Sequence, residues 1–283
     1  MSRIAVVTDS TAYLPPELVA QYGIHVMPQQ LIWGDETFMD GVTIDPPTFY
    51  ERLGRSGDIP TTSQPSAGEF ADFFTEAARD ADGIVGVFIS TELSGTVASA
   101  LAAQELLPDL PIEVVDSRFT TMGLGFVALA AARAAAEGKG LAEVAASARE
   151  LVPRVNVLFI VETLEYLHRG GRIGGASRLL GSALRIKPLL HLTEGRIDAL
   201  ERVRTKRKAV QRMLEVMAER VGNAPVHAAV IHANVPEEAA RLREQVRERF
   251  PYTELHLVEL SPVIGTHVGP GTVGVAFYTG EGE

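Results

Sequence analysis

The sequence Phe88-Ile89-Ser90-Thr91-Glu92-Leu93-Ser94-Gly95-Thr96 joins an apolar run, Gly83 to Ile89, to an Ala-rich stretch with helical patterning, Val97 to Leu107. This pattern predicts a strand that runs into a helix. The first N–H groups of a helix lack internal partners and lie at the positive end of its dipole, so the junction suits an anion. Ser94 and Thr96 would add hydroxyl donors, and Gly95 would let a ligand approach the backbone. A Ser at this position is also a common helix cap, so the junction alone does not establish a site.

Two further strands are predicted, one before and one after this strand in the chain. The apolar runs Ile4 to Val7 and Ile112 to Ser117 are separated from Gly83–Ile89 by helical stretches. This alternation is typical of a Rossmann-like parallel sheet, whose ligand site lies at the carboxyl ends of its strands. All three runs end in polar residues. Asp9 and Ser10, which follow the first run, are candidate ligand contacts, although they could equally hold the turn.

The rest of the chain predicts an insertion and a second domain. Residues 24–45 contain a hairpin pattern around Gly34-Asp35-Glu36 and are expected to form a small antiparallel insertion. The character of the sequence changes near Pro153. Beyond it, short apolar runs alternate with helical stretches, and a hairpin-like pair surrounds Thr193-Glu194-Gly195. We therefore expect an α/β protein with an N-terminal domain at 1–153 and a C-terminal domain with a mixed sheet at 154–283.

Two polar loops carry further candidate residues. Residues 59–66 place four polar residues between Pro60 and Pro65, which predicts a stiff loop that presents Thr62 and Ser63. Residues 261–271 contain three glycines, two prolines and His267, which predicts a shaped loop. A lone His is more often structural than functional, but the surrounding glycines would let its imidazole approach a ligand.

Composition excludes several classes of protein. Hydrophobic residues make up 46% of the chain, which has no low-complexity tract, so a globular protein is expected. The absence of cysteine rules out disulfides, thiolate metal sites and a Cys nucleophile, and is consistent with the cytoplasm, where we expect the protein. The seven His residues show no metal-ligand spacing. The net charge of −10 argues against nucleic acid as a partner.

Positive charge is concentrated in one segment of this acidic chain. Between Arg169 and Arg212 there are twelve Lys and Arg residues against three acids, a local charge of +9. Such a block could be a docking face for an acidic partner, a phosphate or an anionic membrane surface. A solvated helix face is an equally good interpretation of the charge alone.

Five short motifs stand in a specific order. They are Thr8-Asp9-Ser10-Thr11, Thr62-Ser63-Gln64-Pro65-Ser66, Leu93-Ser94-Gly95-Thr96, Leu164-Glu165-Tyr166-Leu167 followed by Gly170-Gly171-Arg172-Ile173, and Gly265-Thr266-His267-Val268-Gly269-Pro270-Gly271. Each motif is weak by itself. Together, over nearly the whole chain, they resemble the DegV family of bacterial fatty-acid-binding proteins.

The resemblance implies a two-domain carrier that encloses one long-chain fatty acid and needs no cofactor. Carried over by position, Thr62 and Ser94 would be the main carboxylate contacts, with Ser63, Gly95 and Thr96 beside them. His267 would close the site from the second domain. In some members a separate fatty acid kinase phosphorylates the bound carboxylate.

The resemblance also gives the remaining residues expected roles. Neutral donors could hold the carboxylate with no Lys or Arg buried against it. The basic block would then dock a kinase or contact a membrane surface transiently, with Arg172 nearest the head group. The further pocket or docking residues on this view are Asp9, Ser10, Gly269, Arg202 and Arg204.

The main alternative is a serine hydrolase that acts on lipid esters, with Ser94 as nucleophile and His267 as base. Against it, the sequence around Ser94 lacks the Gly-x-Ser-x-Gly elbow, and no acid is evident to orient the His. A carbohydrate- or nucleotide-binding domain is less well supported, because the Gly170–Gly175 run does not follow a strand and no Walker-type Lys is present.

Overall fold

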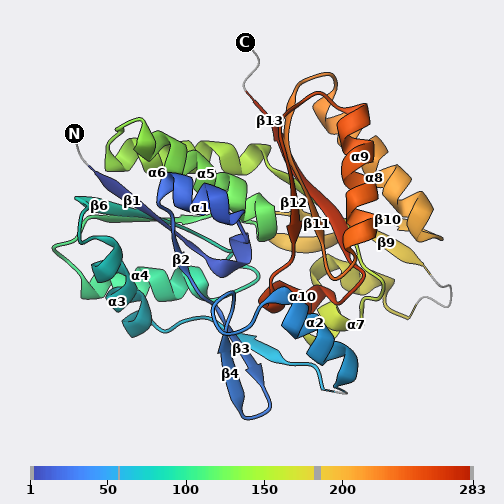
Figure 1. The fold of residues 1–283 in the computed structure, drawn as a ribbon, viewed down its shortest axis with the longest axis horizontal. Helices are drawn as coiled ribbons and strands as arrows, with labels where there is room; N and C mark the ends of the chain where they lie inside the picture. The colour runs from blue at the N-terminus through green and yellow to red at the C-terminus, as the bar shows by residue number, and fades with distance from the viewer. Residues whose placement is uncertain (1–2, 57, 182–185, 281–283) are drawn as a thin grey trace.

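The computed structural model describes residues 3–56, 58–181 and 186–280 as two large sheets with helices between and around them (Figure 1). The strands are β1 (Ile4–Asp9), β2 (His25–Met27), β3 (Gln30–Trp33), β4 (Glu36–Met39), β5 (Thr61–Ser63), β6 (Gly83–Phe88), β7 (Ile112–Asp116), β8 (Asn156–Ile160), β9 (Lys187–Thr193), β10 (Arg196–Val203), β11 (Val226–His232), β12 (Tyr252–Glu259) and β13 (Val273–Thr279). The α-helices are α1 (Pro16–Tyr22), α2 (Pro46–Arg55), α3 (Ala67–Ala77), α4 (Thr96–Leu106), α5 (Thr121–Ala136), α6 (Leu141–Leu151), α7 (Glu165–Arg169), α8 (Lys206–Val221), α9 (Pro236–Arg249) and α10 (Pro262–Val268).

The N-terminal half is built on a parallel sheet in the order β2-β1-β6-β7. Strands β1 and β6 are buried along their whole length, which explains why both are continuous apolar runs. Helices α3 and α4 cover one face, and α5 and α6 cover the other (Figure 1). One prediction was wrong: His25–Met27 belongs to this sheet as the parallel neighbour of β1, not to an antiparallel insertion.

A small antiparallel sheet, β4-β3-β5, projects from this half (Figure 1). The hairpin of β3 and β4 confirms the pattern around Gly34-Asp35-Glu36. Thr61–Ser63 was predicted as a loop but pairs with β3 as its third strand. The two flanking prolines lie outside this short strand, so they do not interrupt its ladder. Thr62 is therefore held by a sheet.

The C-terminal half contains a mixed sheet in the order β10-β9-β8-β13-β11-β12, with α8 and α9 on its outer face (Figure 1). Strand β13 was not predicted, although it lies at the centre and pairs antiparallel with both β8 and β11. The segment 261–271 was predicted as a loop. It instead begins with α10, capped by the Ser261 side chain and started by Pro262, so a helix carries His267.

Helix α5 lies between the parallel and mixed sheets and contacts β1 and β6 on one side and β11 and β13 on the other. Small residues allow this close approach: a Cβ at Gly123 would lie 2.7 Å from a methyl group of Val157. The largest cluster of buried apolar side chains includes residues of both halves. The α/β fold with one parallel and one mixed sheet is thus confirmed, while the domain boundary at residue 153 stays a prediction. Within the described ranges, none of the helices combines the length and the hydropathy needed to cross a bilayer.

Candidate functional site

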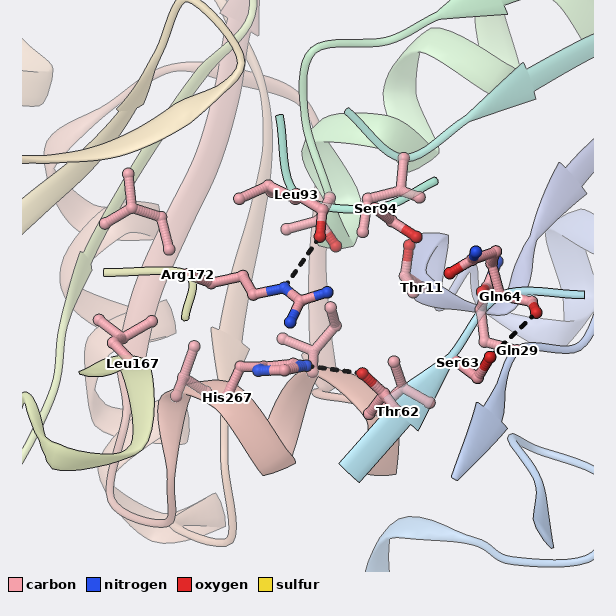
Figure 2. Close-up of a pocket in the computed structure, with 16 residues that line it drawn as sticks. Thr11, Gln29, Thr62, Ser63, Gln64, Leu93, Ser94, Leu167, Arg172 and His267 are labelled. Atoms are coloured by element: carbon pink, nitrogen blue, oxygen red, sulfur yellow. Dashed lines mark hydrogen bonds between the residues drawn. The ribbon is translucent and has the colours of Figure 1, made fainter. Parts of the chain in front are cut away.

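A polar cavity opens between the two halves, and the space in and in front of it, open solvent included, is about 560 Å³. Its lining combines hydroxyl and amide groups with two basic side chains and apolar residues: Thr11, Gln29, Thr62, Ser63, Gln64, Ile89, Leu93, Ser94, Thr120, Leu167, Arg172, Ile197, Val263, Ile264, His267 and Val268. Figure 2 shows Ser94, Gln64 and Thr11 on one side of this space, and Arg172 and His267 on the other. The cavity thus brings together four of the sequence-predicted contacts, Thr62, Ser63, Ser94 and His267.

Ser94 lies just before α4 but does not cap it. The N-cap is Gly95, which makes no side-chain cap, and the Ser94 Oγ lies 2.8 Å from the Oγ1 of Thr96. Gly95 packs against Gln64, whose Nε2 would lie 3.0 Å from a Cβ at that position. The capping interpretation of Ser94 was therefore wrong, and its hydroxyl lies in the cavity wall.

Thr62 and His267 come from different halves and meet in the cavity. The Thr62 Oγ1 on β5 lies 2.8 Å from the Nε2 of His267 on α10 (Figure 2). Burial, reinforced by the nearby positive charge of Arg172, lowers the pKa of His267 to about 4, so the imidazole is neutral at physiological pH. Within the described residues its Nδ1 has no hydrogen-bond partner. A catalytic triad would place a carboxylate there and would join the Ser94 hydroxyl to the ring.

Arg172 also lines the cavity. Its Nε donates to the carbonyl of Leu93 at 3.0 Å, and its NH1 donates to the carbonyl of Gly170 at 2.7 Å. These two bonds fix the guanidinium next to the predicted carboxylate contacts (Figure 2). The expectation that only neutral donors surround the head group therefore needs correction, because a cation lies in the wall.

A second, apolar cavity adjoins the polar cavity, and the space in and in front of it, open solvent included, is about 340 Å³. The two share Thr120, Ile197, Ile264 and Val268 in their walls. The inner cavity is otherwise lined mainly by apolar residues of the mixed sheet and the segments next to it: Thr121, Val157, Phe159, Leu192, Ile231, Leu260 and Thr272. The two cavities thus place a wall rich in hydroxyl and amide groups next to an apolar wall, the chemistry that suits a ligand with one polar end and one apolar part.

Other predicted residues lie behind the cavity wall. Asp9 is fully buried and accepts hydrogen bonds from the backbone N–H groups of Thr11 and Ile89, so it holds the ends of β1 and β6 together. Ser10 donates to Asp40 at 2.7 Å, and both line a separate cleft. These contacts favour the structural interpretation of Asp9 and Ser10, as holders of the turn.

Thr96 and Gly269 are also outside the lining. Thr96 is fully buried and contacts the cavity through Ser94. Gly269 has a φ of 74°, and a Cβ there would lie 2.3 Å from the ring of Tyr166. Its role in the structure is therefore close packing against that ring.

Six of the eleven described cations in the basic block are paired with acids. Arg169, Arg178, Lys187, Arg196, Lys206 and Arg212 each form an ion pair. Arg185 lies outside the described residues. Within the described part of the chain, Arg202, Arg204, Arg207 and Lys208 are exposed and form no ion pair, and they lie from the end of β10 into the first turn of α8. The exposed, unpaired cations among the described residues of the block thus lie in this short segment, and Arg172, which also has no acidic partner, donates to backbone carbonyls in the cavity wall.

Four polar residues in the wall were missed as ligand contacts: Thr11, Gln29, Gln64 and Thr120. Thr11 directly follows Asp9 and Ser10, and Gln64 lies in the polar segment 59–66, so their neighbours could have pointed to them. Gln29 lies between Pro28 and Gln30, where no sequence pattern marks it. It is nevertheless 2% exposed and hydrogen-bonded to Thr96.

Comparison with known proteins decides the family. The family model described as "Uncharacterised protein, DegV family COG1307" matches residues 3–280. The chain belongs to the DegV family. The resemblance deduced from its motifs is thereby confirmed. A DegV domain-containing protein, SCO2569 of Streptomyces coelicolor, is 44% identical to this DegV-family chain and covers 97% of it, with 98% of the relative matched.

Solved DegV structures share the whole fold. A DegV family protein from Thermus thermophilus, described as binding fatty acid, superposes with a TM-score of 0.92 at 37% identity, over 98% of this chain and 99% of the other. DegV from Bacillus subtilis, described as a fatty acid binding protein, superposes with a TM-score of 0.92 at 35% identity, over 99% of this chain and 100% of the other. The cavities described above therefore lie in a fold that binds fatty acids in similar proteins.

Proposed function

We propose that this protein binds one long-chain fatty acid between its two halves, with the carboxylate in the polar cavity and the acyl chain in the apolar one. One observation carries the proposal: the hydroxyls of Thr62 and Ser94 lie in a cavity whose wall continues, through shared residues, into an apolar cavity. The fatty-acid-binding relatives of the same fold support it.

The head group would be held mainly by hydrogen bonds from Thr62 and Ser94, with Ser63 and the Gly95 backbone beside them. Neutral His267 can donate from its Nε2 to Thr62, which leaves the Thr62 proton free for the carboxylate. Arg172 would add a positive charge nearby, although its Nε and NH1 already donate to backbone carbonyls. The guanidinium would therefore stabilise the carboxylate by its nearby charge and would not form a bidentate pair with it.

The acyl chain would supply most of the affinity. A chain of about 16 carbons gains on the order of 10 kcal/mol when buried, at about 0.8 kcal/mol per methylene, before the cost of ordering is subtracted. The polar contacts would then fix the orientation of the ligand. The head-group variants should therefore weaken binding, and blocking the inner cavity should change the preferred chain length.

We further propose that the protein presents the acid to a separate kinase and performs no chemistry itself. A carboxylate oxygen would attack the γ-phosphorus of the kinase's nucleoside triphosphate. The bond from that phosphorus to its bridging oxygen would break, giving an acyl phosphate and a nucleoside diphosphate. The exposed, unpaired cations Arg202, Arg204, Arg207 and Lys208 are suited to dock an acidic kinase surface or an anionic bilayer.

The hydrolase alternative has less support. The Ser94 hydroxyl bonds Thr96 and not the imidazole, and within the described residues no acid accepts from the His267 Nδ1. A hydrolase would be labelled covalently at Ser94 by a serine-reactive phosphonate. We expect no labelling, and stoichiometric modification of Ser94 would favour the hydrolase.

Native mass spectrometry tests the binding proposal directly. The wild type is expected to carry one fatty acid, identified after denaturation, and Ser94→Ala combined with Thr62→Ala should lose or reduce it. Thr75→Ala is a matched control, because its hydroxyl bonds the Ala71 carbonyl on the exposed side of α3. A wild type that holds no lipid after incubation with a panel of fatty acids would refute the proposal.

Docking is tested separately. Charge reversal at Arg202 and Arg204 should slow transfer of fatty acid from anionic liposomes or phosphorylation by a fatty acid kinase, and should leave equilibrium binding unchanged. Reversal of Arg169, which is paired with Glu165, is the control. If neither exchange nor phosphorylation changes in the double variant, the docking role of this segment is excluded.

A further inference from the structure

A buried chain of hydrogen bonds runs from Ser94 in the cavity wall through Thr96 to Gln29. The Ser94 Oγ lies 2.8 Å from the Thr96 Oγ1, and the Gln29 Nε2 donates to the same Thr96 oxygen at 3.1 Å. Thr96 and Gln29 are 0% and 2% exposed. Thr96 and Gln29 therefore form these hydrogen bonds with protein groups and not with bulk water.

The position of Gln29 is fixed from its other side. Its backbone N–H donates to the Ser10 Oγ at 3.1 Å, and the Ser10 hydroxyl in turn donates to an oxygen of Asp40 at 2.7 Å. Gln29 also lies between β2 and β3, which belong to different sheets. The backbone that carries the carboxamide is thus anchored by both sheets.

The direction of these hydrogen bonds depends on which atom of the Gln29 carboxamide pairs with the Thr96 hydroxyl. The Gln29 Nε2 can only donate, and it lies nearer to the Thr96 oxygen, at 3.1 Å, than the Gln29 Oε1, at 3.4 Å. The Thr96 hydroxyl can also donate its proton to that Oε1. When it instead accepts from the Nε2, which is the shorter contact, its single proton is free to be donated to Ser94. Ser94 then has its own proton free for the cavity. With the reverse direction, Ser94 would donate to Thr96 and present only lone pairs to a ligand.

A carboxylate accepts hydrogen bonds and donates none, whereas an alcohol does both. A carboxylate therefore needs Ser94 to donate, whereas an alcohol can pair with Ser94 whichever way the hydrogen bonds run. We propose that Gln29 is a positioning residue that orients the Ser94 hydroxyl as a donor and so sets the preference of the cavity for carboxylates over neutral polar lipids. This inference rests on the proposed binding of fatty acids.

The test compares hexadecanoic acid with hexadecan-1-ol, which have the same chain length and different head groups. Purified protein, delipidated and then incubated with an equimolar mixture of the two, is analysed by native mass spectrometry. Gln29→Glu replaces a donor by an acceptor and should reverse the chain. We expect binding of the acid to fall about 10- to 100-fold, as for loss of a hydrogen bond to a charged group, and binding of the alcohol to change less than about threefold.

Matched variants distinguish the effect of the Gln29–Thr96–Ser94 hydrogen-bond relay from the effect of an added negative charge. Gln21→Glu adds the same charge on the exposed surface of α1 and should leave the ratio of acid to alcohol unchanged. Gln29→Met has a similar length without either polar atom, so it should give an intermediate ratio. It also keeps the test available if Gln29→Glu does not fold.

A double-mutant cycle tests whether the effect passes through Thr96. Thr96→Val breaks the relay with little change of shape, so Gln29→Glu should reduce acid binding far less in that background than alone. An equal reduction in both backgrounds would show direct charge repulsion and would overturn the inference. So would an unchanged ratio in Gln29→Glu. A wild type that binds neither ligand would instead refute the proposed function itself.

Discussion

The Thr62 Oγ1 lies 2.8 Å from the Nε2 of His267, although the two residues are 205 positions apart in the chain. The contact joins the small sheet of the N-terminal half to α10 of the C-terminal half. Because the imidazole is neutral, it can serve Thr62 as an N–H donor in the way that Gln29 serves Thr96. A nitrogen donor thus orients Thr62 directly and Ser94 through the Thr96 hydroxyl, which would direct the protons of both candidate head-group hydroxyls into the cavity.

Substitution of His267 tests this contact. His267→Leu should weaken fatty acid binding about 10-fold, because Thr62 loses the donor that orients its hydroxyl. His267→Gln keeps an Nε2 donor and should lose less. Isothermal titration with a solubilised fatty acid measures both, and His168→Leu on the exposed face of α7 is the control.

The same His gives a prediction for pH. Its pKa of about 4 lies below the range of the experiment, so the imidazole stays neutral from pH 6 to pH 8. Fatty acid affinity should then show no titration from His267 in this range. A transition near pH 6.5 in the wild type that disappears in His267→Gln would contradict the neutral assignment.

Substitutions of two adjacent glycines should affect different properties, ligand binding for Gly170 and stability for Gly171. A Cβ at Gly170 would lie 2.2 Å from the Nδ1 of His267, so Gly170→Ala should displace the ring from Thr62 and weaken binding as His267→Leu does. Gly171 has a φ of 70° and open space around its Cα, so Gly171→Ala should cost about 1 kcal/mol of stability and leave binding intact. Thermal unfolding and titration of both variants distinguish the two. Wild-type affinity in Gly170→Ala would mean that the ring position is unimportant for the ligand.

Local sequence rules predicted much of this fold. The helices at 121–136, 141–151 and 206–221 begin and end where their patterns indicated, since caps, small residues and apolar periodicity act within a few residues. Ser94 could be identified because a polar residue after a buried strand and before a helix marks the ligand-binding edge of a parallel sheet. Strand β2 was misassigned because its three residues carry no pattern that distinguishes pairing with β1 from pairing with β3.

The missed features depend on partners distant in sequence. Strand β5 forms because β3 offers an edge to it, and α10 forms from signals, Ser261 and Pro262, that three nearby glycines obscured. Gln29 has no signal of its own, since its importance comes from contacts with Ser10 and Thr96. The residues on motifs were thus predictable, and the residues that orient them were not.

Chain-length preference should depend on the inner cavity. Ile231 on β11 lines the apolar cavity and is absent from the wall of the polar one. Ile231→Phe should fill part of that space and shift the preference from hexadecanoic towards dodecanoic acid, because each excluded methylene forfeits about 0.8 kcal/mol. Native mass spectrometry with an equimolar mixture of the two acids measures the shift. Ile231→Val, which enlarges the space, is the control, and an unchanged profile in Ile231→Phe would place the acyl chain elsewhere.

Asp40 should make stability depend on pH. It is 1% exposed, and burial raises its pKa to about 7 despite the hydrogen bond from Ser10, whereas an unfolded Asp titrates near 3.8. The folded state therefore binds the proton more tightly, so this group's contribution to the free energy of unfolding falls as the pH rises from about 4 to about 7 and is constant above that.

Asp40→Asn removes this dependence and keeps an oxygen that can accept from Ser10. Relative to the wild type, the variant should gain stability between pH 5 and pH 8, at up to about 1.4 kcal/mol per pH unit while Asp40 titrates. Urea unfolding at several pH values measures the difference, with the exposed Asp109→Asn as control. A difference between Asp40→Asn and wild type that stays constant from pH 5 to pH 8 would show that Asp40 is ionised throughout, held by contacts stronger than the cost of its burial.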